Sequence, residues 1–408
     1  MFLARLRSPI VLLLALALGL PASRPMLSAE APSLRPPSGT RLDPLTRSGF
    51  EAYYSLDYDT AIRDFERVAS ANPNDPFALN HLLSAVLFHE LYRIGAFDTG
   101  LYANNSFLER KQLPPDPKAG ARIKELIGRV TALCDQRLAA KPDDLEALYA
   151  RGVARGMQST YMGLVEKSWI AALRNAKGAR DDHERILQLD PGYVDAKTVV
   201  GVHEYIAGSL PLFVKVAAFL AGYRGNREKG LRYLYEAGNA GGESAVDAKI
   251  ALGLFLRREQ RYDEALGVAR SLTTLYPRNF LFALEVANIL NDSGHGPEAI
   301  TAYQRVIENA PRFYQPHLEL AYFGLGESLK GQRRYAQAVD AYANVSKQPQ
   351  VEAELKLRAN LYAGQMYDLM GQRRQALERY QAVLAAAPTD SRWADLARKH
   401  LKEPFHEK

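Results

Sequence analysis

The sequence predicts an all-α superhelical solenoid of helix–turn–helix repeats with two or three insertions. Three observations support this fold class. Pro277 and Pro311 stand 34 residues apart, small and aromatic residues recur at fixed places in units of that length, and no alternating apolar run is long enough for a strand. A repeat of this length is one helix pair, which buries its apolar face only against its neighbours. The chain is therefore expected to form a long array.

The repeat is clearest between Pro277 and Pro311, which are 34 residues apart. Small residues at repeat positions 8 and 20 let the first helix of a pair, helix A, approach the second, helix B. An aromatic residue near position 24 fills the space between repeats, and a proline at position 32 ends helix B. Five units follow this scheme, and a capping helix is expected to cover the last of them at 391–408. The units are 42–75, 246–279, 280–313, 319–352 and 357–390.

Three segments, YDTAIRDFERVASANP, YDEALGVARSLTTLYP and YAQAVDAYANVSK, repeat one pattern of aromatic, small and apolar residues. The pattern resembles the tetratricopeptide-repeat superfamily. This resemblance implies an array of paired helices in which the helix A side chains line a concave face.

Residues 76–245 are less regular. A helix A is expected at about 76–94 and a helix B at about 117–140, with a long loop between them. The run GSLPLFVKVAAFLAGYRGNREKGLRYLYEA resembles the tetratricopeptide-39 family, whose fungal relatives include a mitochondrial outer-membrane inclusion-clearance protein. Bacterial exported tetratricopeptide proteins look similar as well. These resemblances imply a shape and no particular reaction or cofactor.

The N-terminal region has the order of a secretory signal peptide. Two arginines precede an unbroken apolar run over 10–20, and a proline with small residues follows it. The run is shorter than the roughly 20 residues of a membrane span, although an uncleaved anchor is the alternative. We expect a signal peptide and cleavage region at 1–29, a linker at 30–41, and a periplasmic or secreted protein.

Composition narrows the class of partner. The chain is 47% hydrophobic and 24% charged, as in folded proteins, and its formal net charge is +6. Three arginines of this excess fall in 1–29, and no stretch alternates basic and aromatic residues, so a nucleic acid is disfavoured. Cys134 is the single cysteine, which excludes an intrachain disulfide, and it is expected to be buried in a helix.

No motif predicts catalysis, a metal or a cofactor. His203 and Glu204 begin like a zinc-protease helix, but Ala207 occupies the place of the second ligand. His81 and His89 share a helix face without an evident third ligand. The polar cluster at 181–184 should spread around its helix, and Ser-nucleophile and phosphate-loop motifs are missing from the sequence. The protein is therefore not expected to be an enzyme.

The resemblance to the tetratricopeptide-repeat superfamily implies a partner-binding groove on the helix A side, at repeat positions 2, 5, 9, 12 and 13. Mixed aromatic, amide and charged side chains at these positions suit an extended peptide or a partner helix. The alternative is that they are only exposed helix residues. The groove residues are Phe50, Tyr53, Tyr54, Asp247, Arg257, Arg258, Asn288, Asn291, Asp292, Phe323, Glu327, Lys330, Arg358, Gln365 and Asp368. Arg257 and Arg258 are expected to be accessible.

Two functions remain open at this point. The first is an exported scaffold that binds an envelope protein through the groove. The second is a solute-binding accessory protein in which segments 97–113 and 208–226 enclose a small apolar ligand. The apolar insertion 210–223 is expected to pack against the array, because its apolar residues surround most of a helix. A partner-docking helix and a membrane contact are the other readings of this insertion.

Overall fold

The computed structural model describes residues 43–97, 99, 114–209, 225–310, 317–349 and 351–407. Within these residues the regular elements are helices, and there is no strand. The chain divides after Glu259 into two compact units, each of which is described by itself. The expected signal peptide, the linker and the insertion 210–223 lie outside the described residues.

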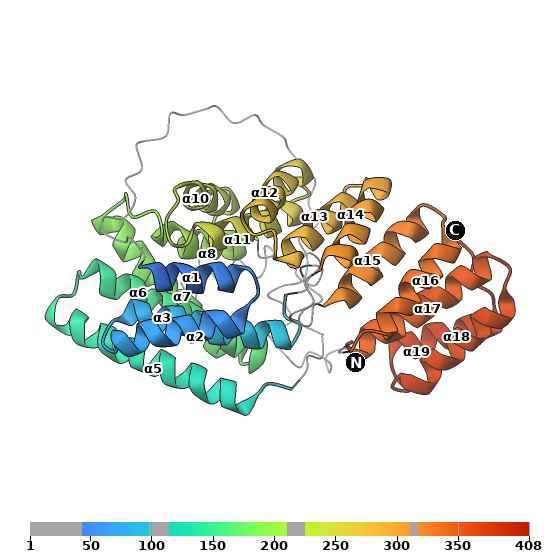
Figure 1. Cartoon of the computed structure of the whole chain (residues 1–408), viewed down its shortest axis with the longest axis horizontal. Helices are drawn as coiled ribbons and strands as arrows, with labels where there is room; N and C mark the ends of the chain where they lie inside the picture. The colour runs from blue at the N-terminus through green and yellow to red at the C-terminus, as the bar shows by residue number, and fades with distance from the viewer. Residues whose placement is uncertain are drawn as a thin grey trace, which may run out of the picture. The chain divides into compact units, whose positions relative to one another are not determined.

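The first unit consists of successive helix pairs (Figure 1). Helices α1/α2, α3/α5, α6/α7 and α8/α10 pack as pairs, and α11 follows. Their bounds are α1 Pro44–Tyr54, α2 Tyr58–Ala71, α3 Pro76–Arg93, α5 Pro117–Ala140, α6 Leu145–Thr160, α7 Trp169–Leu189, α8 Ala196–Gly208, α10 Arg227–Asn239 and α11 Ala245–Arg258. A π-helix, Tyr161–Val165, extends α6. The irregular region 76–245 is thus three pairs, and the extra length lies between helix A and helix B of each.

The second unit repeats the arrangement with regular spacing (Figure 1). Helices α13/α14, α15/α16 and α17/α18 form pairs, α12 precedes them, and α19 packs on α17 and α18. Their bounds are α12 Tyr262–Leu275, α13 Phe280–Asp292, α14 Gly296–Asn309, α15 Leu318–Gly331, α16 Tyr335–Ser346, α17 Ala353–Leu369, α18 Arg373–Ala386 and α19 Arg392–Lys402. The predicted all-α repeat fold is confirmed. The expected repeat 246–279 is divided, because α11 belongs to the first unit and α12 to the second.

Prolines stand two residues after the end of six of the helix B elements, whereas α10 and α16 end without one at that place. The residue before a proline is driven out of the helical region, so the helix ends one residue earlier still. The last helical residue and its proline are Ala71 and Pro73, Ala140 and Pro142, Leu189 and Pro191, Leu275 and Pro277, Asn309 and Pro311, and Ala386 and Pro388. An Asp or Asn side chain then often caps the next helix A. Asp75, for example, accepts from the backbone N–H of Phe77 at 2.9 Å.

The turn from helix A to helix B has one backbone requirement. Repeat position 15 is left-handed in each of the five clear units. Its φ angles are 65° at Leu56, 59° at Gln260, 82° at Gly294, 55° at Arg333 and 73° at Gly371. The next residue then bonds back into helix A, as when the N–H of Gln372 reaches the carbonyl of Tyr367 at 2.8 Å. Glycine adopts this conformation freely, whereas leucine, glutamine and arginine are strained there.

Helix A and helix B approach each other where a glycine faces a ring sixteen residues later. A Cβ on Gly326 would lie 2.5 Å from Tyr342, and one on Gly364 would lie 2.6 Å from Tyr380. Such distances are too short for any side chain but hydrogen. Gly49 faces Phe65 in the same way, at 2.5 Å. The small residue expected at position 8 is therefore required by the ring at position 24.

The same contact recurs in the irregular region. Gly152 of α6 lies directly under the ring of His183 on α7, and these residues are further apart in sequence because the extra length lies between them. At position 20, Ala61, Ala299 and Ala338 are fully buried. Position 20 of these units is thus occupied by a buried small residue.

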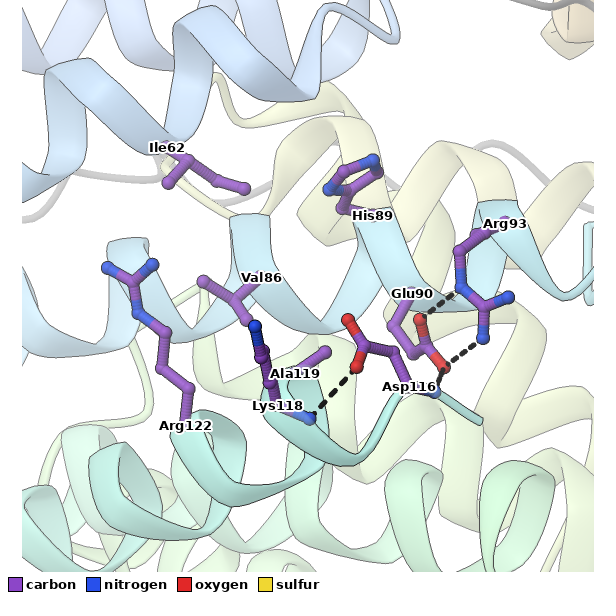
Figure 2. A pocket seen from close by; sticks show the side chains of 9 residues that line it. All are labelled: Ile62, Val86, His89, Glu90, Arg93, Asp116, Lys118, Ala119 and Arg122. Carbon is purple, nitrogen blue, oxygen red and sulfur yellow. Dashed lines mark hydrogen bonds and ion pairs between the residues drawn. The ribbon is translucent and has the colours of Figure 1, made fainter. Parts of the chain in front are cut away.

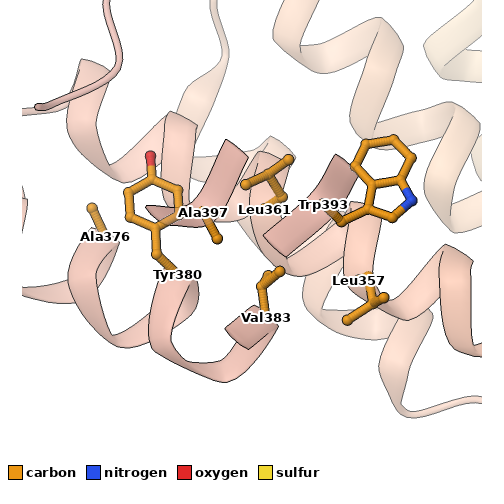
Figure 3. Packing of buried hydrophobic residues seen from close by; sticks show 7 residues of the cluster. All are labelled: Leu357, Leu361, Ala376, Tyr380, Val383, Trp393 and Ala397. Atoms are coloured by element: carbon orange, nitrogen blue, oxygen red, sulfur yellow. The ribbon is translucent and has the colours of Figure 1, made fainter. Parts of the chain in front are cut away.

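The last pair is completed by α19. Leu357 and Leu361 of α17, Tyr380 and Val383 of α18, and Trp393 of α19 meet in one buried cluster (Figure 3). Its remaining members are Ala376 and Ala397. Because α19 supplies an aromatic ring to this cluster, it is part of the core as well as a cap.

Candidate functional site

Part of the predicted groove is core in the first unit. Tyr53 and Tyr54 on α1 are buried, and Phe50 stacks on Tyr54 with ring centroids 6.1 Å apart. Phe50 also meets Phe65 of α2 at 5.1 Å and His81 of α3 at 4.8 Å. These rings pack α1 against α2 and α3. Their role is therefore structural.

The start of α11 meets the same rings. Asp247 accepts a hydrogen bond from Tyr54, and its carboxyl group is surrounded by protein. His81 Nε2 lies 2.9 Å from a carboxylate oxygen of Glu243. Burial, with a smaller contribution from the charges of Glu243 and Asp195, raises the pKa of the Asp247 carboxyl to about 7. Polar contacts therefore close the helix A side of this unit onto α11.

Arg257 is also part of this closure. It is only 6% exposed, and its guanidinium donates to Thr99 Oγ1 at 3.1 Å. The expectation that Arg257 is accessible is therefore wrong. Arg258 is partly buried. A buried arginine carries its hydrogen bonds inside the fold, and this is a structural role.

In the second unit, buried tyrosines of helix B bond back to predicted groove residues of helix A. The three hydrogen bonds run from Tyr303 to Asn288, from Tyr342 to Glu327 and from Tyr380 to Asp368. Asp368 also pairs with Arg373 at 2.9 Å, and its side chain is fully buried. Asn288, Glu327 and Asp368 thus hold their own helix pairs together, and Asp368 is not an open groove residue.

Other predicted residues connect neighbouring repeats. Asn291 on α13 accepts from the hydroxyl of Ser328 on α15 at 2.7 Å. Gln365 on α17 lies 3.5 Å from the ring nitrogen of His400 on α19. Asp292 is exposed at the end of α13. Asn291 and Gln365 thus take part in contacts between neighbouring helices, whereas Asp292 is accessible.

Two cations lie on aromatic rings across α15, α17 and α19. The guanidinium of Arg358 is 4.5 Å from the ring centroid of Phe323 and 6.0 Å from that of Trp393. Lys330 Nζ is 4.9 Å from the centroid of Tyr362. The rings of Phe323 and Tyr362 are themselves 5.9 Å apart. We call Phe323, Lys330, Arg358, Tyr362 and Trp393 the cation–aromatic face.

This face carries incompletely compensated positive charge. Arg358 makes no ion pair with any described residue, and its Nε has no hydrogen-bond partner there. Lys330 pairs with Glu327 at 2.8 Å, with both side chains partly accessible. The Nε of Arg358 is buried, so a carboxylate could meet this guanidinium only through its terminal N–H groups. The face can therefore bind an anionic group beside an apolar one.

Sequence reasoning found Phe323, Lys330 and Arg358 but missed Tyr362 and Trp393. Tyr362 stands at repeat position 6, one place from the positions assigned to the groove. Trp393 lies in the helix interpreted as a polar cap. One signal was present, since the chain has only two tryptophans and a capping helix has no need of one.

The structure offers no catalytic arrangement at the polar sequences. His183 is buried and bonds the carbonyl of Ala179, while its neighbour Asp182 pairs with Arg151 at 2.7 Å. Among the described residues, no three His, Cys, Asp or Glu side chains converge as metal ligands would. Burial raises the pKa of the Cys134 thiol to about 11, which leaves it unreactive.

A cleft of about 250 Å³ lies between α2, α3 and α5 (Figure 2). Its lining is Ile62, Val86, His89, Glu90, Arg93, Asp116, Lys118, Ala119 and Arg122. Glu90 accepts from Arg93 at 2.7 Å and from the backbone N–H of Asp116 at 2.8 Å, so its charge is used internally. A charged, half-open cleft of this size does not suit a small apolar ligand. No described helix is long and apolar enough to cross a membrane.

Comparison with known proteins identifies the repeat. A family model described as tetratricopeptide repeat matches residues 284–350, which extend from α13 to the end of the α15/α16 pair. No curated protein matches the chain. Among solved structures, yeast Tom70 is 12% identical over 89% of this chain and 88% of its own, with a TM-score of 0.38. Pseudomonas aeruginosa PilF is 13% identical over 61% and 97%, with a TM-score of 0.39. YrrB, described as a TPR protein with an unusual peptide-binding site, is 18% identical over 53% and 97%, with a TM-score of 0.35.

The raised pKa of Asp247 makes the stability of the first unit depend on pH. The carboxyl titrates near 4 when unfolded and at about 7 when folded, so its contribution is complete below pH 4 and is lost as the pH rises through 7. Asp247→Asn keeps a neutral group at every pH. In urea unfolding, the free energy of unfolding of the variant should rise relative to that of the wild type between pH 5 and pH 8, by roughly 1 to 4 kcal/mol.

A second buried group titrates in the opposite sense and must be separated from Asp247. Burial lowers the pKa of His183 to about 4, which makes the folded state lose stability as the pH falls below about 6.5. His183 is common to both proteins and cancels in their difference. A difference that stays constant from pH 5 to pH 8 would contradict the account of Asp247.

Proposed function

We propose that this chain, an array of tetratricopeptide repeats, is a scaffold that binds a protein partner through the cation–aromatic face of its second unit. The observation that carries the proposal is the pair of cations on rings, Arg358 on Phe323 and Lys330 on Tyr362. Both cations stand on helix A of neighbouring repeats, the side on which the register predicts a groove. The first unit is a poorer candidate, since its helix A side is closed by Asp247, Glu243 and Arg257.

The chemistry of the face points to an acidic segment of the partner. A carboxylate can accept from the edge of the Arg358 guanidinium, and an adjacent apolar side chain can lie against the rings. The neighbouring Arg392 has its guanidinium 4.2 Å from the Trp393 ring centroid, and its charge is partly balanced by Glu354 at 3.3 Å. Positive charge at this partly accessible face also speeds the encounter with an acidic partner.

The two alternatives have less support. An apolar-ligand carrier would need an enclosed apolar cavity, whereas the described cleft between α2, α3 and α5 is half-open and charged. The segments expected to roof a ligand lie largely outside the described residues. An enzyme would need converging acid–base or nucleophilic groups, and the polar side chains described above are used in ion pairs and packing.

The proposal includes export to the periplasm or the medium, where the partner would be an envelope protein. It rests on the charged and apolar segments of residues 1–29. The exported protein should begin between Ser23 and Ala31, which intact mass spectrometry of the periplasmic or secreted fraction would measure. Recovery of the full-length mass from a soluble cytoplasmic fraction would argue against export.

Binding through the face can be tested with labelled acidic peptides that contain an aromatic residue. Lys330→Ala and Arg358→Ala should each weaken the best binder about tenfold in fluorescence anisotropy, because each removes a cation held at the face. The loss should shrink at high salt.

Arg374→Ala is the matched control. Its side chain is 91% exposed on α18 and pairs with Glu378 of the same helix, so binding should not change. Circular dichroism and melting should show all three variants folded. Equal losses for Arg374→Ala and the face variants, or no acidic peptide binding to the wild type, would refute the proposal.

A further inference from the structure

The segment that follows α19 returns to the helix A side of the second unit. The backbone N–H of Phe405 donates to Asp368 Oδ2 at 2.8 Å. Further on, the Tyr335 hydroxyl donates to the carboxylate of Glu407 at 3.2 Å. Residues 403–407 form no helix or strand, and Glu403 is extended, as the residue before Pro404 must be. The segment thus crosses from α17 toward the start of α16.

The surface under this segment is built from residues that are already fixed. Asp368 is held by Arg373 at 2.9 Å and by the Tyr380 hydroxyl at 2.8 Å, and its side chain is fully buried. Arg373 also donates to the carbonyls of His400 and Leu401, at 2.7 and 2.9 Å. Asp368 therefore offers a rigid acceptor, and no rearrangement is needed before a backbone N–H can bind it.

One side chain anchors the segment. The ring of Phe405 meets His400 edge to face, with centroids 5.4 Å apart at 87°. His400 is itself 6% exposed and lies 5.5 Å from the ring of Tyr380. Pro404, His406 and Glu407 remain exposed. The segment is consequently bound by one ring, one backbone N–H and one carboxylate.

A hydrogen bond to the backbone and a packed aromatic ring are contacts that can also hold an extended peptide of another molecule. We propose that Asp368, His400 and Tyr335 form a docking site for an extended partner segment with an aromatic residue after a proline and an acidic residue two places on. Residues 403–407 occupy this site in cis and must be displaced before the partner segment binds.

The inference rests on the proposed function, since the docking site continues the cation–aromatic face along α17. Gln365 stands between Arg358 and Asp368 on that helix and lies 3.5 Å from His400. A partner bound by its acidic part at Arg358 could thus extend its chain to Asp368. The chemistry of this docking site differs from that of the cation–aromatic face, because Asp368 accepts from a backbone N–H and His400 packs against an aromatic ring.

The strength of the block can be put in numbers. A tethered segment has an effective concentration on the order of 1 mM. If the free segment binds with a Kd on the order of 0.1 mM, the cis segment weakens a competing peptide about tenfold. Removal of the cis segment should therefore increase the affinity for a competing peptide about tenfold.

The probe is the labelled peptide EPFHEK, the sequence of residues 403–408. A chain that ends at Lys402 should bind it at least tenfold more tightly than the full chain, and the peptide should raise the melting temperature of that shorter chain. The full-length variant Phe405→Ala should also bind the peptide, because it keeps α19 intact while losing the anchor. The peptide EPAHEK is the control and should bind neither.

Failure of the peptide to bind Phe405→Ala, or to bind and stabilise the chain ending at Lys402, would overturn the inference and leave 403–407 as a simple cap. The proposed function fails separately, through loss of acidic-peptide binding at Arg358 and Lys330. In the chain ending at Lys402, Tyr335→Phe removes the hydroxyl that meets Glu407 and should weaken EPFHEK binding, whereas Arg374→Ala should leave it within twofold.

Discussion

The close contact between a glycine of helix A and a buried ring of helix B is the constraint on which the rest of the structure depends. Where Gly326 lies under Tyr342 and Gly364 under Tyr380, the two helices approach so closely that only hydrogen fits. This approach lets the tyrosine hydroxyl reach a polar side chain of helix A. One ring therefore fixes the spacing of its helix pair through packing and its rotation through a hydrogen bond.

The same contact accounts for how well the fold could be predicted. A glycine and an aromatic residue sixteen places apart are visible in sequence, and so are the prolines that end helix B. The irregular pairs were harder, because length inserted between the two helices separates Gly152 from His183 while leaving their packing unchanged. Insertions at the turn hide the period in the sequence without altering the pair that it describes.

The candidate site could be predicted only in part. Repeat position determines which side of a helix a residue occupies, so Phe323, Lys330 and Arg358 were found. Repeat position does not determine which contacts a residue makes with elements outside its own helix pair. Asp368 is not open in the groove, because it pairs with Arg373 and accepts a hydrogen bond from the segment after α19. Arg257 is bonded to Thr99, which is more than 150 residues away in the chain. Such contacts depend on tertiary folding, which no local pattern records.

The central claim is that the ring-on-glycine contact sets the helix pair, and two glycines of α15 test it directly. A Cβ at Gly326 would lie 2.5 Å from Tyr342, whereas a Cβ at Gly331, near the exposed end of the same helix, would meet nothing within 4 Å. Urea unfolding should show Gly326→Ala destabilised by about 1 to 3 kcal/mol through overpacking. Gly331→Ala should be neutral or stabilised by up to about 1 kcal/mol, since alanine favours the helix. Equal effects of the two substitutions, or a more stable Gly326→Ala, would contradict the account.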